Sequence, residues 1–322
     1  MILILADSSD PWALAVFREL CGRGQEVCLA SPANLLNEVP LNFSVTSESI
    51  LHDGTVKIKG TAVRLSDLTG VFCRMPYPLP LALEDLTPQD QDYVKKETAA
   101  AWFALLNALP CRVVNRPIPG GLPTLVTGRP PLLAVATRLG LSLPPSRCTT
   151  DVEDALQQFR TWGNRAYVKP LGQSEPGMLL HGDEGESRIC EWMSTAALSL
   201  QRVPGGQPMC VYVVGGTVAA TVITSGTSSV GSTSNEVVAS QAIARCAEFA
   251  CAMGLDYAEC LIVLQSDGEV SCLDVSGSPN FWRCPLEVQH HVTAELATYL
   301  SEERSLPIHD SFAGADSRSH TR

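Results

Sequence analysis

The amino-acid sequence predicts an α/β fold in which a small doubly wound N-terminal domain is followed by two α+β lobes. The first observation is the order strand, helix, strand at residues 2–6, 10–24 and 26–30, which is how a doubly wound sheet begins. The second is a pair of apolar, β-branched segments around Gly215-Gly216, which predicts a hairpin. The third is the length of 322 residues, which suits about two domains or one multi-lobed protein.

The N-terminal domain, residues 1–119, is predicted from its alternating elements. Residues 2–6 are short and uniformly apolar, which is typical of a buried strand. Apolar residues recur at helical spacing from 10 to 24, and glycines end that helix. The Pro- and Gly-rich segment 117–123 marks the boundary. No GxGxxG pattern follows the first strand, so the sequence argues against a dinucleotide site.

Two lobes are expected after that boundary, at residues 120–194 and 195–300. In the first lobe, Asp151 is a good N-cap for the helix that follows it, and a strand at 166–169 leads into a loop rich in Gly and Ser. In the second, the hairpin precedes a helix, two strands and a closing helix. Residues 301–322 are predicted to be a disordered tail.

The chain is acidic, with 23 Lys and Arg against 34 Asp and Glu and a formal net charge of -11. This charge disfavours binding to nucleic acid or to an anionic membrane. No apolar stretch reaches the roughly 18 residues of a membrane span, and the N-terminus does not resemble a signal peptide. The 12 cysteines form no CxxC pair, so they are expected to be reduced thiols of a cytoplasmic protein.

Four segments of the chain carry a resemblance to a known family. In chain order they are Val113-Val114-Asn115-Arg116-Pro117 with residues 132–146, Tyr167-Val168-Lys169-Pro170-Leu171-Gly172, residues 201–206 with Tyr212-Val213-Val214-Gly215-Gly216, and Leu255-Asp256-Tyr257-Ala258 with Leu273-Asp274-Val275-Ser276. In this order and spacing they resemble the ATP-grasp superfamily of carboxylate–amine ligases, which includes the ribosomal-protein glutamate ligase and peptide-modifying ligases. The resemblance spans roughly residues 70–300 and implies an ATP-grasp-like fold, with ATP between the two lobes.

The resemblance implies an ATP site that draws on both lobes. Lys169 stands at a strand end before the Gly/Ser loop, where a point charge would contact phosphate oxygens; a solvated lysine is the alternative. Arg129 stands where the family usually has another nucleotide-binding lysine. Backbone groups of the segment 201–203 would pair with adenine. The implied nucleotide-binding residues are Arg129, Lys169, Gly172, Ser174, Gln201, Arg202 and Val203.

The same resemblance implies Mg²⁺ as a cofactor, held in the family by an Asp, a Glu and an Asn. Here the three positions hold Leu261, Asp274 and Ser276. Asp274 and Ser276 can offer oxygen ligands, whereas Leu261 offers none. With one carboxylate where two are expected, the sequence predicts a divergent metal site.

The family's catalytic arginine before the hairpin is replaced by Cys210. Two other arginines are candidates for catalysis by facing a substrate carboxylate. Arg283 lies towards the C-terminus, and Arg74 ends a strand of the first domain. The forked guanidinium suits a carboxylate, while a surface ion pair is the alternative for both.

These features favour an ATP-dependent carboxylate–amine ligase that acts through an acyl phosphate. Its partners would be small-molecule or peptide substrates that carry the carboxylate and the amine. The retained Lys169 and Asp274 support this hypothesis. The alternative is an ATP-grasp-like protein that binds nucleotide, peptide or a partner protein without ligation, and Leu261, Ser276 and Cys210 support it.

Overall fold

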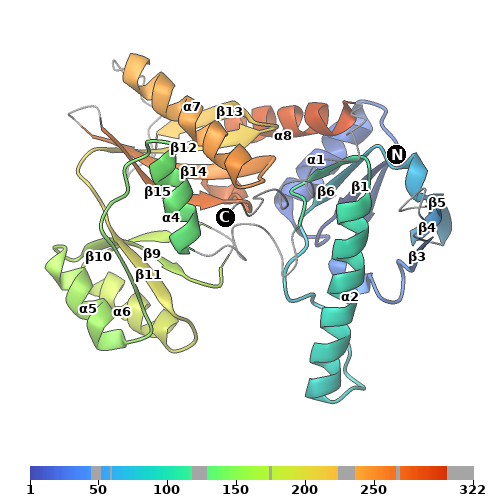
Figure 1. Ribbon diagram of the computed structural model, residues 1–322, viewed down its shortest axis with the longest axis horizontal. Coiled ribbons are helices and arrows are strands. Elements are labelled where there is room, and N and C mark those ends of the chain that lie inside the picture. Colours follow the sequence, from blue (N-terminus) through green and yellow to red (C-terminus); the bar gives the residue numbers. More distant parts are fainter. Residues whose placement is uncertain are drawn as a thin grey trace, which may run out of the picture.

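Four β-sheets are present in the parts of the chain that the computed structural model describes, which are residues 1–44, 52–58, 60–117, 129–173, 176–223, 236–265 and 269–302. The sheets divide between an N-terminal domain, a middle lobe and a C-terminal lobe (Figure 1). The architecture is the mixed α/β class that the sequence predicts. None of the described helices is both long and apolar enough to cross a membrane.

The N-terminal domain begins with strand β1 (Ile2–Leu5), helix α1 (Pro11–Gly22) and strand β2 (Val27–Ala30). Strands β6 (Gly70–Cys73) and β7 (Arg112–Val114), with helix α2 (Pro88–Ala108) between them in sequence, complete a parallel sheet of order β2-β1-β6-β7. The central strand β1 is buried on both faces, which explains its uniformly apolar sequence. Asp10 caps α1 by accepting a hydrogen bond from the Ala13 backbone.

A small antiparallel sheet extends this domain. It consists of β3 (Leu41–Ser44), β4 (His52–Ile58) and β5 (Thr61–Arg64), and the 3-10 helices η1 (Pro32–Asn34) and η2 (Leu65–Asp67) flank it in sequence. Strands β4 and β5 pair as a hairpin, with Val56 opposite Val63. Buried Val56 and Ile58 join the core on this side of the parallel sheet.

The middle lobe is a second α/β unit with its own core. Its antiparallel sheet has the order β10-β9-β11-β8, and the elements are β8 (Ser146–Thr149), α5 (Val152–Thr161), β9 (Arg165–Pro170), β10 (Met178–His181), α6 (Gly182–Met193) and β11 (Leu198–Arg202). Helices α5 and α6 cover one face of this sheet, where Phe159, Val168 and Leu200 are fully buried (Figure 1). The sheet continues to Arg202, beyond residue 194, where the sequence analysis places the end of the first lobe.

The C-terminal lobe carries an antiparallel sheet of order β13-β12-β14-β15. Its elements are α4 (Arg129–Arg138), β12 (Gln207–Val214), β13 (Thr217–Ile223), α7 (Glu236–Ala252), β14 (Tyr257–Leu264), β15 (Val270–Ser276), η3 (Phe281–Arg283) and α8 (Leu286–Ser301). Residues of α4 and α7 pack on one face of this sheet, around Phe249. Helix α8 packs on the opposite face through Val292 and Leu296.

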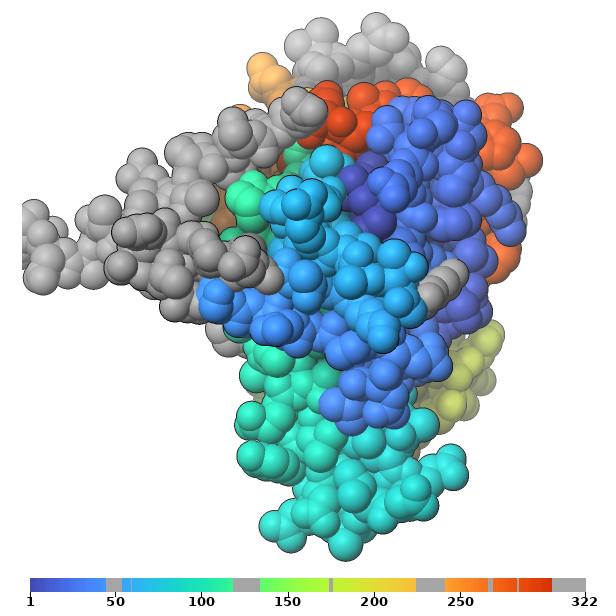
Figure 2. Space-filling view, turned by 90° about the vertical axis from the view of Figure 1, so that its right-hand side faces the viewer, coloured from blue at the N-terminus to red at the C-terminus, as the bar shows by residue number. Residues whose placement is uncertain are grey.

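One continuous core joins the N-terminal domain to the C-terminal lobe. Trp12 and Tyr212, from the two units, belong to the same buried cluster. Asn115, at the end of β7, donates to the carbonyl oxygens of Tyr257 and Gly277 and accepts from the Tyr257 backbone. Figure 2 shows the orange-red α8 lying along the blue N-terminal domain. These two units therefore form a single base, to which the middle lobe is attached.

None of the twelve cysteines is part of a disulfide in this structure. Seven of them are buried, so they act as small apolar side chains. Burial raises the pKa of the Cys73 thiol to about 11, and that of Cys111 also to about 11. These two thiols are therefore neutral at physiological pH.

Candidate functional site

One face of the middle-lobe sheet is polar and yet buried. Side chains alternate along a strand, so Val168 points towards α5 and α6 while Tyr167 and Lys169 point to the other face. On the neighbouring strand β11, Gln201 pairs with Tyr167 and Ser199 pairs with Lys169. All four polar side chains are buried. A polar sheet face that is shielded from solvent is unusual and marks a candidate site.

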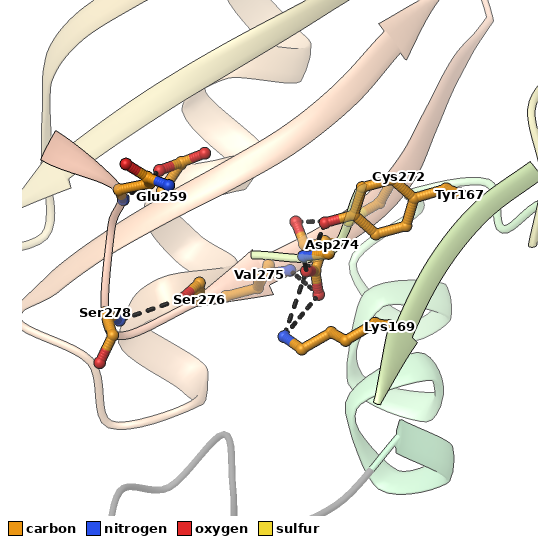
Figure 3. A network of polar contacts seen from close by, with 10 residues as sticks. Tyr167, Lys169, Glu259, Cys272, Asp274, Val275, Ser276 and Ser278 are labelled. Carbon is orange, nitrogen blue, oxygen red and sulfur yellow. Dashed lines mark hydrogen bonds and ion pairs between the residues drawn. The ribbon is translucent and has the colours of Figure 1, made fainter. Parts of the chain in front are cut away.

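Three donors of the middle lobe converge on one carboxylate of the C-terminal lobe. Tyr167 Oη donates to Asp274 Oδ2 at 2.7 Å, and Lys169 Nζ lies 3.2 Å from the same oxygen and 3.4 Å from Oδ1 (Figure 3). The Gly177 backbone N–H donates to Oδ2 at 3.3 Å. Within β15, the Val275 backbone N–H donates to Oδ1 at 2.9 Å. Asp274 is thus neutralised and held by protein donors, and it is only 2% exposed.

Apolar side chains surround this contact between the lobes. Tyr167, Val263 and Leu273 form a buried cluster, against which Val203 and Leu261 pack. Leu261 pairs directly with Asp274 across strands β14 and β15. The position that the resemblance assigns to an Asp ligand is therefore occupied by an apolar side chain at the junction of the lobes.

Gly177 reaches Asp274 because it has no side chain. A Cβ at this position would lie 2.6 Å from the Val168 carbonyl oxygen and 2.8 Å from Cζ of Tyr167. Both distances are too short for any other residue without movement of the backbone. The close approach of this loop to β9 therefore requires glycine.

The residues around Asp274 do not fit a complete magnesium site. Ser276 Oγ accepts a hydrogen bond from the Ser278 backbone, and Leu261 has no ligand atom. Glu259 lies opposite Ser276 in the paired strands β14 and β15. Figure 3 shows that the Glu259 carboxylate lies apart from Asp274. Its Oε2 accepts a hydrogen bond from the Asn280 backbone N–H. Across the described ranges, no three His, Cys, Asp or Glu side chains lie together as metal ligands would. Asp274 alone supplies too little negative charge for a divalent cation.

The predicted nucleotide-binding residues fall into three groups. Lys169 and Gln201 lie on the buried polar face, and Val203 borders the apolar cluster at the junction of the lobes. The Arg202 side chain is exposed, and its backbone N–H donates to the Pro145 carbonyl, so this N–H is not free to pair with adenine. Gly172 is exposed in the turn after β9, with no other atom near the position of a Cβ. Ser174 lies outside the described residues, as does the side chain of Arg129 at the start of α4.

Of the two predicted substrate-binding arginines, the structure describes the side chain of Arg74 and not that of Arg283. Arg74 follows β6, and its Nε lies 2.6 Å from Asp10 Oδ2 in an ion pair whose side chains are mostly buried. Asp10 thereby both caps α1 and neutralises Arg74. Arg283 ends η3, and its side chain lies outside the described part of the chain.

Sequence reasoning missed Tyr167 and Ser199 as residues of the site. The alternation of Tyr167, Val168 and Lys169 is visible in the sequence and would place the tyrosine and the lysine on one face. The role of Ser199 depends on strand pairing, which local patterns do not specify.

No protein-family model and no curated protein matches this sequence. Solved structures do match along almost the whole chain. The macrocyclase MdnC from Microcystis aeruginosa MRC, bound with precursor peptide MdnA, is 14% identical with a TM-score of 0.69, covering 93% of this chain and 99% of the other. The ATP-grasp ligase PsnB, complexed with precursor peptide PsnA2 and AMPPNP, is 20% identical with a TM-score of 0.67, covering 93% and 97%.

A third match is the RimK domain protein ATP-grasp from Sphaerobacter thermophilus DSM 20745, which is 16% identical with a TM-score of 0.56 and covers 93% of this chain and 98% of the other. All three matches extend over nearly the full length of both chains. The fold that the four sequence segments imply is thereby confirmed. This chain therefore has the fold of these ATP-grasp proteins.

Proposed function

We propose that this chain is an ATP-dependent ligase that joins a carboxylate to an amine, with a peptide as one substrate. The observation that carries the proposal is the buried polar face around Lys169, which meets the C-terminal lobe at Asp274. The nucleotide would lie at this junction. The peptide substrate is supported by the structural neighbours, two of which were solved with precursor peptides. The twelve cysteines outside disulfides and the use of ATP agree with a cytoplasmic location.

Three residues of the polar face, Lys169, Ser199 and Gln201, take part in nucleotide binding under this proposal. Lys169 would supply the positive charge that phosphate oxygens require. Ser199, next to it on β11, has a buried hydroxyl that makes no hydrogen bond to the described residues, and it would donate to the same phosphate. Gln201 and Val203 would border the base at the end of the strand.

The reaction would proceed in two group transfers. A carboxylate oxygen of the substrate attacks the γ-phosphorus of ATP, the bond to the β–γ bridging oxygen breaks, and ADP leaves. The amine nitrogen then attacks the acyl carbon, inorganic phosphate leaves, and the nitrogen loses a proton. The neighbour PsnB was solved with Mg and ADP, whereas the residues around Asp274 do not make a complete magnesium site here. The steps assigned to this chain are therefore binding and orientation of the two substrates.

A second candidate function is nucleotide or peptide binding without ligation. The observation that favours it is the pairing of Leu261 with an Asp274 that already accepts hydrogen bonds from both lobes. A site that lacks the second carboxylate would hold nucleotide and turn it over slowly or not at all.

Incubation with ATP, Mg²⁺ and a set of short peptides that contain Glu and Lys distinguishes these functions. The ligase predicts ADP formation that depends on the peptide, together with a peptide product that has lost water. Binding of ATP with neither product supports the second function. A failure of ATP to bind contradicts both.

A further inference from the structure

We propose that Asp274 serves as an internal anion on Lys169 and, with Tyr167, latches the middle lobe to the C-terminal lobe until a nucleotide phosphate displaces its carboxylate. This inference rests on the proposed nucleotide site at Lys169 and adds regulation to it. It concerns the protein before nucleotide arrives. The latch is a hydrogen-bonded ion pair, so it opens and closes without any covalent change.

The donors to Asp274 come mainly from the opposite lobe. Tyr167 and Lys169 stand two residues apart on the same face of β9, and Gly177 follows in the loop before β10. Asp274 itself lies on β15 of the C-terminal lobe (Figure 3). Separating the two lobes therefore breaks all three contacts together. This is the arrangement that a latch requires, because the contact is complete only when the lobes are closed.

A phosphate and Asp274 would compete for one cation. Lys169 Nζ is 3.2 Å from Asp274 Oδ2, and the two side chains are 11% and 2% exposed. Solvent and salt therefore screen the pair little. A phosphate brought to Lys169 would meet the buried carboxylate and be repelled by it. Nucleotide binding thus favours the state in which the carboxylate has turned away from Lys169.

The apolar side chain of Leu261 supports this latch. It lies opposite Asp274 and packs in the apolar cluster at the junction of the lobes. An apolar neighbour lowers the local dielectric and strengthens the ion pair, whereas an aspartate there would place a second negative charge beside Asp274. The same leucine that removes a metal ligand therefore favours the contact between Lys169 and Asp274.

The middle lobe depends on this contact because its apolar core is separate. Its described buried apolar residues, Phe159 and Leu200 among them, form a cluster that contains no residue of the other units. The apolar contact to the C-terminal lobe is the small cluster of Tyr167, Val263 and Leu273. Tyr167 takes part in both the apolar contact and the latch, so its hydroxyl can be removed while its ring stays.

The test uses the variants Tyr167→Phe and Asp274→Asn of the full chain. The matched controls are Tyr212→Phe, a buried tyrosine of the C-terminal lobe, and Asp92→Asn, an aspartate in an exposed ion pair with Lys96. Two quantities are measured for each protein. One is the affinity for ATP, measured with Mg²⁺ and again in the presence of a chelator of divalent cations. The other is the rate of amide hydrogen exchange at residues 176–181 without nucleotide.

The latch predicts a gain in both quantities. Loss of the Tyr167 hydroxyl removes a hydrogen bond to a charged group, which corresponds to about a tenfold change in equilibrium. We therefore expect Tyr167→Phe to bind ATP about tenfold more tightly without Mg²⁺ and to exchange those amides about tenfold faster. Asp274→Asn should show a larger gain, because it also removes the repulsion between carboxylate and phosphate. The two controls should match the wild type.

Three results would overturn the latch, and they differ in what else they overturn. If the wild type binds ATP and neither variant gains affinity or faster exchange, the latch is wrong and the nucleotide site stands. A loss of affinity in Asp274→Asn that is seen only with Mg²⁺ would make Asp274 a metal ligand instead. If no protein in the set binds ATP, the proposed function fails, and the latch fails with it because its opening ligand is gone.

Discussion

Tyr257 illustrates how a single buried side chain affects stability. Its hydroxyl is fully buried and makes no hydrogen bond to any described residue. A buried polar group without a partner costs about 1–3 kcal/mol, so its removal is favourable or neutral. We expect Tyr257→Phe to raise the free energy of unfolding by up to about 1 kcal/mol in denaturant titration. A decrease of more than about 1 kcal/mol would show that the hydroxyl has a stabilising partner.

Cys73 gives a prediction for alkaline pH. Burial raises its pKa from 9.0 to about 11 in the folded protein. The unfolded chain loses this proton first, so stability falls as pH rises from about 9 to about 11, by up to about 1.4 kcal/mol per pH unit. Cys73→Ala should flatten this slope in unfolding experiments, whereas Cys148→Ala, at an exposed position, should leave it unchanged. Equal slopes in all three proteins would contradict the assignment.

Leu261 and Ser276 give a prediction for the metal. The double variant Leu261→Asp with Ser276→Asn supplies the ligand types that the sequence resemblance implies, and a second carboxylate would better neutralise Mg²⁺. We expect ATP affinity in the presence of Mg²⁺ to rise by about tenfold, measured by calorimetry. Leu261→Asn with Ser276→Asn is the uncharged control. If the charged and uncharged variants behave alike, Asp274 is not part of a latent metal site.

At the scale of elements, local sequence patterns predict some strands well and others poorly. The buried strand at residues 2–6 and the hairpin around Gly215-Gly216 are present, because their apolar patterns reflect local burial. Strand β11 lies inside the middle sheet, between β9 and β8. Its polar residues Ser199 and Gln201 look exposed in sequence. They are buried because another lobe covers that face, and no local pattern carries this information.

Helix α5 offers a prediction at the same scale. Asp151 Oδ1 accepts hydrogen bonds from the backbone N–H groups of Glu153 at 2.9 Å and Asp154 at 3.5 Å. The loss of an N-cap costs about 1 kcal/mol, so Asp151→Ala should lower the free energy of unfolding by that amount. Asp151→Asn keeps a capping oxygen and should lose less. If both variants lose stability equally, the effect comes from charge and not from capping.

At the scale of the whole molecule, the site arises from residues that are far apart in sequence. Lys169 and Asp274 were both predicted from sequence, but their direct contact was not, because 105 residues separate them. The resemblance assigned one to phosphate and the other to metal. Only the packing of the middle lobe on the C-terminal lobe brings the two charges together, and that packing depends on Tyr167 and Leu261.

The separate core of the middle lobe leads to a prediction about dynamics. The N-terminal domain and the C-terminal lobe share one buried cluster, whereas Phe159 and its neighbours form another. We expect amides of β9 and β11 to exchange through a local opening of lower free energy than the opening of β1 and β12. Bound ATP should slow exchange in the middle lobe. Uniform exchange across the sheets would show that the three units open as one.

The most direct test of the account is a calorimetric titration of ATP into the wild type and into a Lys169→Ala variant, each with and without Mg²⁺. Lys96→Ala, on the exposed surface of α2, is the control, and the double variant Lys169→Met with Asp274→Asn avoids an unpaired buried carboxylate. The account predicts that ATP binds the wild type and the Lys96 variant, and that both Lys169 variants lose this binding. Equal ATP affinity in folded wild type and Lys169 variants would contradict it.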